Sequence, residues 1–154
     1  MAGTTTCMVD SFRLQVMTAT HDFTTTTGNV FKVALIKVSP TGTYDKTTTN
    51  YSTITGNSDE VASGGGYTTG GFAWTAAQNT TPTVTNHVAT TTWSVNPSWT
   101  SATFSTTACM IYNSSASNKA VSLHDFGGTQ TVTAGTLTLV LPTNNDTSAI
   151  LRLA

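Results

Sequence analysis

The side chains of this sequence with the most reactive chemistry are histidines, cysteines and the acids beside two of the histidines. They are His21, Asp22, His87, Cys109, His124 and Asp125. A zinc site needs three or four converging ligands, and the spacing of these residues matches no zinc signature. Neighbours on a strand point to opposite faces, so His124 and Asp125 cannot bind one ion without a bulge. No Gly-x-Ser-x-Gly nucleophile motif occurs. We therefore expect no catalytic residue, no metal and no cofactor.

Two glycine-rich stretches look like nucleotide-binding motifs. A phosphate-binding loop follows a strand, opens a helix and usually supplies a lysine, and Ser63–Gly71 lacks this context. Asp125-Phe126-Gly127 matches a magnesium-binding motif of kinases, but a kinase needs a lysine strand, a catalytic loop and far more chain. We interpret the first stretch as an irregular turn and the second as a coincidence.

Five aromatic side chains are candidates for a sugar-stacking surface. They are Tyr67, Trp74, Trp93, Trp99 and Tyr112. Trp93 and Tyr112 alternate with other apolar residues, which favours core positions for both, with the polar tip reaching a hydrogen-bond partner. The sequence leaves open whether Trp74 and Trp99 lie in the core or on a contact surface.

The composition indicates one domain with an unusually uncharged surface. The 154 residues suffice for a core without disulfides or metals. Only 8% are charged, against about 25% in ordinary domains, and threonine makes up about a quarter of the chain. The net charge is -1 and no basic cluster occurs, so we expect no nucleic-acid partner.

The cysteines and the apolar runs bear on the compartment. Cys7 lies in a polar arm and Cys109 in an apolar run, so we expect a free thiol and a small core residue, which fits a reducing cytoplasm. The N-terminus lacks the pattern of a signal peptide, and no apolar run has membrane-spanning length. We therefore expect no membrane partner.

A β-hairpin is the predicted centre of the fold, with arms Ala108–Tyr112 and Ala120–Phe126 and a polar turn between them. Phe126-Gly127-Gly128 is predicted to end the second arm. Further strands are predicted at 30–38, 72–76, 83–95, 99–104, 129–132, 136–141 and 149–153.

One short helix is predicted, from Asp10 or Ser11 to Thr18, because helix formers occupy this segment without Gly or Pro. A strand with Phe12 and Leu14 on one face is the alternative. Two segments remain polar: residues 1–9, predicted to be an extended arm, and residues 40–66, predicted to be a long surface loop.

The fold class predicted for 1–154 is all-β, a single antiparallel β-sandwich domain for which a jelly roll is one arrangement, with one N-terminal helix. The predicted core consists of Val33, Leu35, Val88, Trp93, Met110, Ile111, Val121, Leu123, Leu137, Leu139 and Ile150.

The order of several short motifs resembles a family of small virion structural proteins of tailed bacteriophages. The motifs are His21-Asp22-Phe23, Phe31–Leu35, Gly66–Gly71, Trp93, Ile111–Asn113, Asp125–Gly128, Gly135–Leu139, Pro142 and Ala149–Leu153. The threonine-rich N-terminus and the pair Trp74 and Trp99 depart from the family pattern.

The resemblance implies a structural role in the virion, after assembly in the host cytoplasm, and transfers no active site. Decoration of the outside of the phage head is the function expected, with the major capsid protein or another virion protein as partner. A tail or fibre-base protein is the alternative within virions, and a carbohydrate-binding module the alternative outside them. A homo-oligomer, dimer or trimer, is expected, with residues 2–9 and 40–66 lying against the shell or a neighbouring copy and gaining order there.

Overall fold

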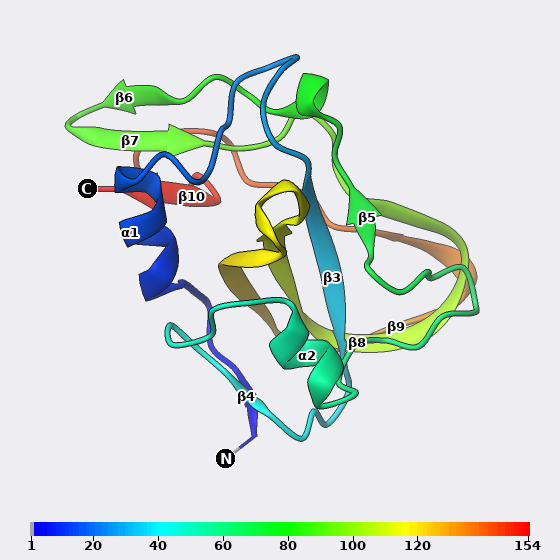
Figure 1. Cartoon of the computed structure of the whole chain (residues 1–154). Coiled ribbons are helices and arrows are strands. Elements are labelled where there is room, and N and C mark those ends of the chain that lie inside the picture. The colour runs from blue at the N-terminus through cyan, green and yellow to red at the C-terminus, as the bar shows by residue number, and fades with distance from the viewer. Residues whose placement is uncertain (1) are drawn as a thin grey trace.

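The computed structural model describes residues 2–154 and is mostly β, with several antiparallel sheets and few helices (Figure 1). The strands are β1 Gly3–Thr4, β2 Cys7–Met8, β3 Phe31–Lys37, β4 Thr43–Tyr44, β5 Phe72–Ala73, β6 Thr83–Thr85, β7 Val88–Thr91, β8 Ser98–Asn113, β9 Lys119–Thr138 and β10 Leu151–Leu153. The helices are α1 Asp10–Met17, α2 Ser52–Gly56, and the 3-10 helices η1 Ala76–Gln78 and η2 Ser114–Ala116. This confirms the predicted all-β, sandwich-like class and the N-terminal helix.

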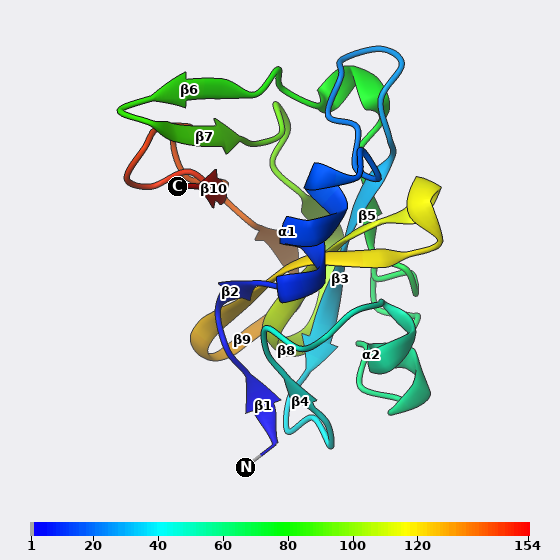
Figure 2. The ribbon, with the colours of Figure 1, turned by 60° about the vertical axis from the view of Figure 1, so that its left-hand side comes forward.

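Three sheets form the described part of the chain. The largest has the strand order β2-β9-β8-β3-β5, a smaller one has β10-β7-β6, and a parallel pair joins β1 to β4. The small antiparallel sheet lies beyond one end of the large one in both views (Figures 1 and 2). Within residues 2–154 no helix combines the length and apolar character needed to cross a membrane.

The predicted central hairpin is confirmed and is longer than predicted. Met110 pairs with Leu123 and Cys109 with His124, which joins the two predicted arms in antiparallel register. β9 does not end at Phe126–Gly128. Gly127 has a φ of 73°, and the strand continues beyond it. A second irregularity lies at Ala134, with a φ of 48°. The segments predicted as separate strands at 129–132 and 136–141 therefore belong largely to β9, since bulges absorb extra residues without ending a strand.

The prediction of one strand over 83–95 is wrong. This segment folds into the β6–β7 hairpin, in which Val84 pairs with Ala89. Asn86 and His87 form its two-residue turn with φ values of 49° and 66°, the conformation that matches the twist of paired strands. The apolar alternation continues through the turn residues, so the sequence pattern did not indicate a turn there.

Segment 40–66 is not the plain surface loop that was predicted. It contains β4 and α2, a second helix that the sequence did not indicate, and it buries Tyr44, Ile54 and Val61. Tyr51 stacks on Tyr112 of β8 with ring centroids 4.4 Å apart. Isolated apolar and aromatic side chains therefore anchor this segment to the large sheet.

The N-terminal arm also packs on its own chain rather than extending away. Gly3 pairs with Thr43 in the parallel β1–β4 pair, and Cys7 pairs with Leu123 at the edge of the large sheet. Val9 is fully buried. Residues 2–9 therefore have contacts within their own chain, because β4 and β9 supply edges with which β1 and β2 pair.

The predicted core is buried in its central part. The fully buried members are Val33, Leu35, Trp93, Met110, Ile111, Val121 and Leu123. The other four, Val88, Leu137, Leu139 and Ile150, are only partly buried, and in the last strand Leu151 takes the buried position instead of Ile150. All four partly buried residues line one cavity, described below.

Candidate functional site

The structure separates most of the residues considered as metal ligands. Cys109 and His124 are cross-strand neighbours on β8 and β9. His21 lies before β3, and His87 lies exposed in the β6–β7 turn. Across residues 2–154 no group of three or more His, Cys, Asp or Glu side chains is arranged to hold a metal ion.

His21 is a buried structural histidine. Its Nε2 lies 2.8 Å from Gln15 Oε1 and its Nδ1 lies 3.0 Å from Asn113 Nδ2. The Asn113 amide is oriented by two further bonds, because its Oδ1 accepts from Ala116 N–H and its Nδ2 donates to Asn29 Oδ1. The amide therefore donates to His21 Nδ1, which selects the neutral ring with its proton on Nε2.

Protonation of His21 is disfavoured by this arrangement. Burial, and secondarily the charge of Lys119, lowers the pKa of His21 to about 4. The unfolded chain, with an ordinary histidine pKa of about 6.5, then binds more protons than the native protein at mildly acid pH. The stability is therefore fully present above about pH 6.5 and lost as the pH falls toward about 4.

The wild type is expected to lose unfolding free energy as the pH falls from about 7.5 to 4.5. We expect this loss to be about 2 to 3 kcal/mol smaller in His21→Gln. The measurement is urea denaturation across this pH range. His87→Gln changes an exposed histidine and serves as the matched control, with the wild-type pH slope expected. Equal slopes for wild type and His21→Gln would contradict the assignment.

A Ser–His pair that the sequence analysis missed lies on β9. Ser122 Oγ and His124 Nε2 are 2.9 Å apart, because residues two apart on a strand share a face. Ser122 is fully buried, so a substrate carbonyl cannot reach its hydroxyl. Asp125 is exposed and its Oδ1 accepts from Gly127 N–H, so it does not orient the imidazole. The pair is arranged as a buried hydrogen bond and not as a nucleophile with its base.

The glycine-rich stretch Ser63–Gly71 lies directly against the backbone of β8 and β3. Gly65 C=O accepts from Thr103 N–H of β8 at 2.8 Å. A Cβ on Gly65 would come within 2.3 Å of Thr103 O, and a Cβ on Gly66 within 2.7 Å of Thr100 O. Close backbone approach therefore explains these glycines.

An acidic side chain already occupies this turn. Glu60 accepts hydrogen bonds from the hydroxyl groups of Tyr51 and Tyr67 and from Gly70 N–H. Burial and the Glu60 carboxylate raise the pKa of both tyrosines, which keeps them protonated as donors. A phosphate here would meet a carboxylate, so the turn does not fit phosphate binding.

The aromatic candidates are buried and form no sugar-stacking surface. Trp93 and Tyr112 lie in the core, as predicted. Trp74 is also fully buried and stacks on Trp93 at 4.3 Å between ring centroids. Trp99, 6% exposed, packs edge-on against Phe72 of β5, toward which the far half of the β8–β9 hairpin curls (Figure 1). The hypothesis that Trp74 and Trp99 mark contact surfaces is wrong.

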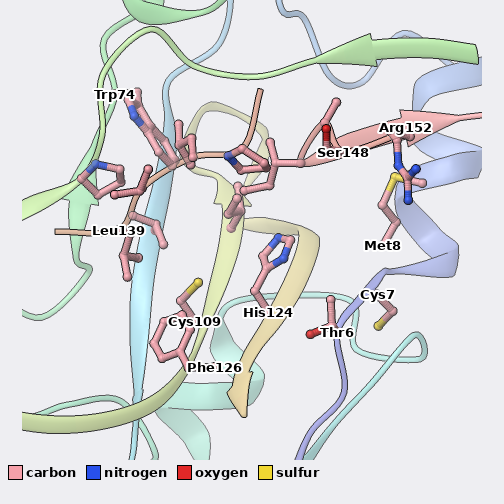
Figure 3. Close-up of a pocket in the computed structure, with 18 of the residues that line it drawn as sticks. Thr6, Cys7, Met8, Trp74, Cys109, His124, Phe126, Leu139, Ser148 and Arg152 are labelled. Atoms are coloured by element: carbon pink, nitrogen blue, oxygen red, sulfur yellow. The ribbon is translucent and has the colours of Figure 1, made fainter. Parts of the chain in front are cut away.

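The candidate site is a cavity of about 1000 Å³ beside the large sheet (Figure 3). One wall is formed by Val33 of β3, Ile111 of β8 and His124 of β9, and the facing wall by residues 139–150. Most of its lining is apolar. Cys7 and Cys109 are free and both line it. The sequence signal for this site was the group of predicted core residues in the last third of the chain, which face the cavity instead of filling it.

No family model, curated protein or solved structure matches this chain. The likeness to phage virion proteins therefore rests on the order of the sequence motifs alone.

Proposed function

We propose that this chain is a structural protein of a bacteriophage virion that decorates the outside of the head as a homo-oligomer, bound to the major capsid protein. The order of the sequence motifs supports a virion protein. The structural observation that supports an assembly role is an open strand edge on β9. The segments expected to lie against the shell or a neighbouring copy, 2–9 and 40–66, pack on their own chain, so the contact between copies is assigned to this edge instead.

The open edge runs from Phe126 to Thr138. β2 pairs with β9 only at Ser122 and Leu123, and beyond that point β8 is the only strand of residues 2–154 that pairs with β9. No charged residue and no proline occurs between Phe126 and Thr138, and most of these side chains are exposed. Charges and prolines are common protections of an edge strand against pairing, and here both are missing.

The partner at this edge is a second copy of the chain. Two uncharged edges meet around a two-fold axis without like-charge repulsion, and threonine hydroxyls can hydrogen-bond across the junction. A dimer then presents two sites to neighbouring shell subunits, so weak individual contacts add through effective concentration. Exposed ion pairs would contribute little to such attachment, and the chain has few charges to form them.

The function is tested by the copy number of this chain in purified particles. Head decoration requires a copy number approaching that of the shell subunit. A copy number of only a few per particle contradicts head decoration and supports the tail or fibre-base alternative.

The β9 edge is tested by sedimentation velocity at increasing protein concentration. Thr133→Lys sets two like charges near one another across the two-fold axis, so we expect the dimer dissociation constant to rise several-fold. Thr55→Lys adds the same charge to an exposed position of α2 and is the matched control, with no change expected. A monomer at all concentrations, or equal effects of both variants, would contradict pairing through β9.

A further inference from the structure

The cavity beside the large sheet is a built feature of the fold. Its outer wall, residues 139–150, is tied down at both ends. Leu139 N–H donates to Pro97 O and Leu141 N–H to Asn96 Oδ1, each at 2.9 Å. At the other end β10 pairs with β7, with Leu151 opposite Thr91. This wall therefore spans the sheet at a distance and does not collapse onto it.

The cavity is partly open to solvent and is large enough for a small molecule. About 1000 Å³ lies at the upper end of the range of about 300 to 1000 Å³ found for small-molecule sites. Because its walls are mainly apolar, an apolar occupant would release water from them, and this release favours binding.

The deep part of the cavity carries no charge at neutral pH. Burial lowers the pKa of His124 to about 4, and its Nε2 is already paired with Ser122 Oγ. Burial likewise raises the pKa of the Cys109 thiol to about 12, so it stays protonated. The deep walls therefore fit a hydrocarbon chain better than a charged or strongly hydrogen-bonding ligand.

In Figure 3, Arg152 of β10 and Met8 lie toward one end of the cavity, Trp74 and Leu139 lie toward the opposite end, and His124 lies between them. Arg152 Nη1 is anchored by the main-chain oxygens of residues 146 and 147. Arg13 of α1 also lines the cavity.

One acid accompanies these two arginines. Asp146 lines the cavity too, and its Oδ2 accepts from Asn86 Nδ2 at 2.6 Å. Among the lining side chains, two guanidinium groups therefore stand against one carboxylate.

We propose that this cavity binds an elongated apolar molecule that ends in a carboxylate, a fatty acid, with its chain along Val33, Ile111 and Leu139 and its carboxylate at Arg13 and Arg152. The chain gains from burial in the uncharged interior. The carboxylate gains charge-assisted hydrogen bonds from the guanidinium groups. This proposal does not depend on the role in a virion.

Isothermal titration of the full chain with decanoate and with decanol tests the proposal. We expect saturable one-to-one binding of both, with decanoate about ten-fold tighter, which corresponds to about 1.4 kcal/mol. Arg13→Gln/Arg152→Gln is expected to bring decanoate to the affinity of decanol and to leave decanol unchanged. Absence of saturable decanoate binding to the wild type overturns the proposal, and so does tighter binding of decanol.

A variant that fills the cavity separates this site from binding elsewhere. Leu139→Trp places a large side chain in the outer wall and is expected to abolish binding of both probes. Val84→Trp, on the exposed β6, is the matched control and is expected to bind as the wild type does. Thermal melting checks that each variant is folded. Unchanged binding by folded Leu139→Trp overturns the assignment to this cavity, as does a segment of another protein chain found in it in a reconstructed particle.

Discussion

Gly71→Ala is expected to destabilise the protein by on the order of 4 kcal/mol or more. Gly71 has a φ of 74°, and a Cβ there would lie 1.9 Å from Val33 O and 2.8 Å from Ala34 Cα. Both atoms belong to the backbone of β3, an interior strand of the large sheet. The clash therefore cannot be relieved by rotating a side chain, and the turn before β5 must move away from the sheet.

Substitutions at two other glycines distinguish the cost of the steric clash from the cost of the backbone conformation. Gly127 has a nearly equal φ of 73° but open space around its Cβ position, so Gly127→Ala should cost only about 1 to 2 kcal/mol. Gly56, in α2, also has open space and no strained φ. Gly56→Ala should be neutral or stabilising by up to about 1 kcal/mol. Urea denaturation of all three variants makes the comparison, and a Gly71→Ala cost no larger than that of Gly127→Ala would refute the close approach.

Asp59→Ala is expected to cost about 3 kcal/mol or more of unfolding free energy. Asp59 is fully buried and accepts from Thr41 N–H, Gly42 N–H and the Tyr44 hydroxyl, the last at 2.6 Å. It also forms an ion pair with Lys37 of β3 at 3.0 Å. Its removal leaves buried donors without an acceptor, and it removes the ion pair that joins segment 40–66 to Lys37 of the large sheet.

The pH dependence of stability should identify the Asp59 charge. Burial alone would raise the pKa of Asp59, but hydrogen bonds from Tyr44, Thr41 and Gly42 and the contact with Lys37 outweigh it and hold this pKa well below its usual range. The stabilisation is therefore present above about pH 4 and lost as the pH falls below that value.

Asp59→Asn keeps the shape but removes the charge, and should lose this acid-dependent part of the stability. Asp125→Asn changes an exposed carboxylate and should stay within about 0.5 kcal/mol of the wild type. Urea denaturation between about pH 3 and 7 compares them. If the stability of Asp59→Asn followed the same pH dependence as that of the wild type, the Asp59 charge would not stabilise the fold.

The elements with strong local patterns were predictable. Phe31–Lys37 alternates cleanly, and the two arms of the central hairpin are separated by a polar turn, so these strands and their pairing followed from periodicity. The helix at Asp10–Met17 followed from the absence of breakers and the presence of helix formers. In each case the information lies within about ten residues, the range over which alternation and helical spacing can be recognised.

Where local sequence signals conflicted with the tertiary structure, the predictions from the sequence were wrong. Gly127-Gly128 indicated an end to the strand, and pairing with β8 carried β9 through it. Asn86 and His87 continued an alternation and yet form a turn. Both outcomes depend on which strand pairs with the segment. A short stretch of sequence does not contain that information.

The sequence by itself determined the all-β class, the central hairpin, the N-terminal helix and the uncharged character of the surface, because these depend on composition and local period. Only the tertiary structure decided that Trp74 and Trp99 are buried, that Asp59 connects segment 40–66 to the sheet, and that a cavity lies under the C-terminal segment. Each of these features joins residues distant in sequence. Their contacts depend on how strands pair across long separations, and a single sequence does not encode that pairing in any local pattern.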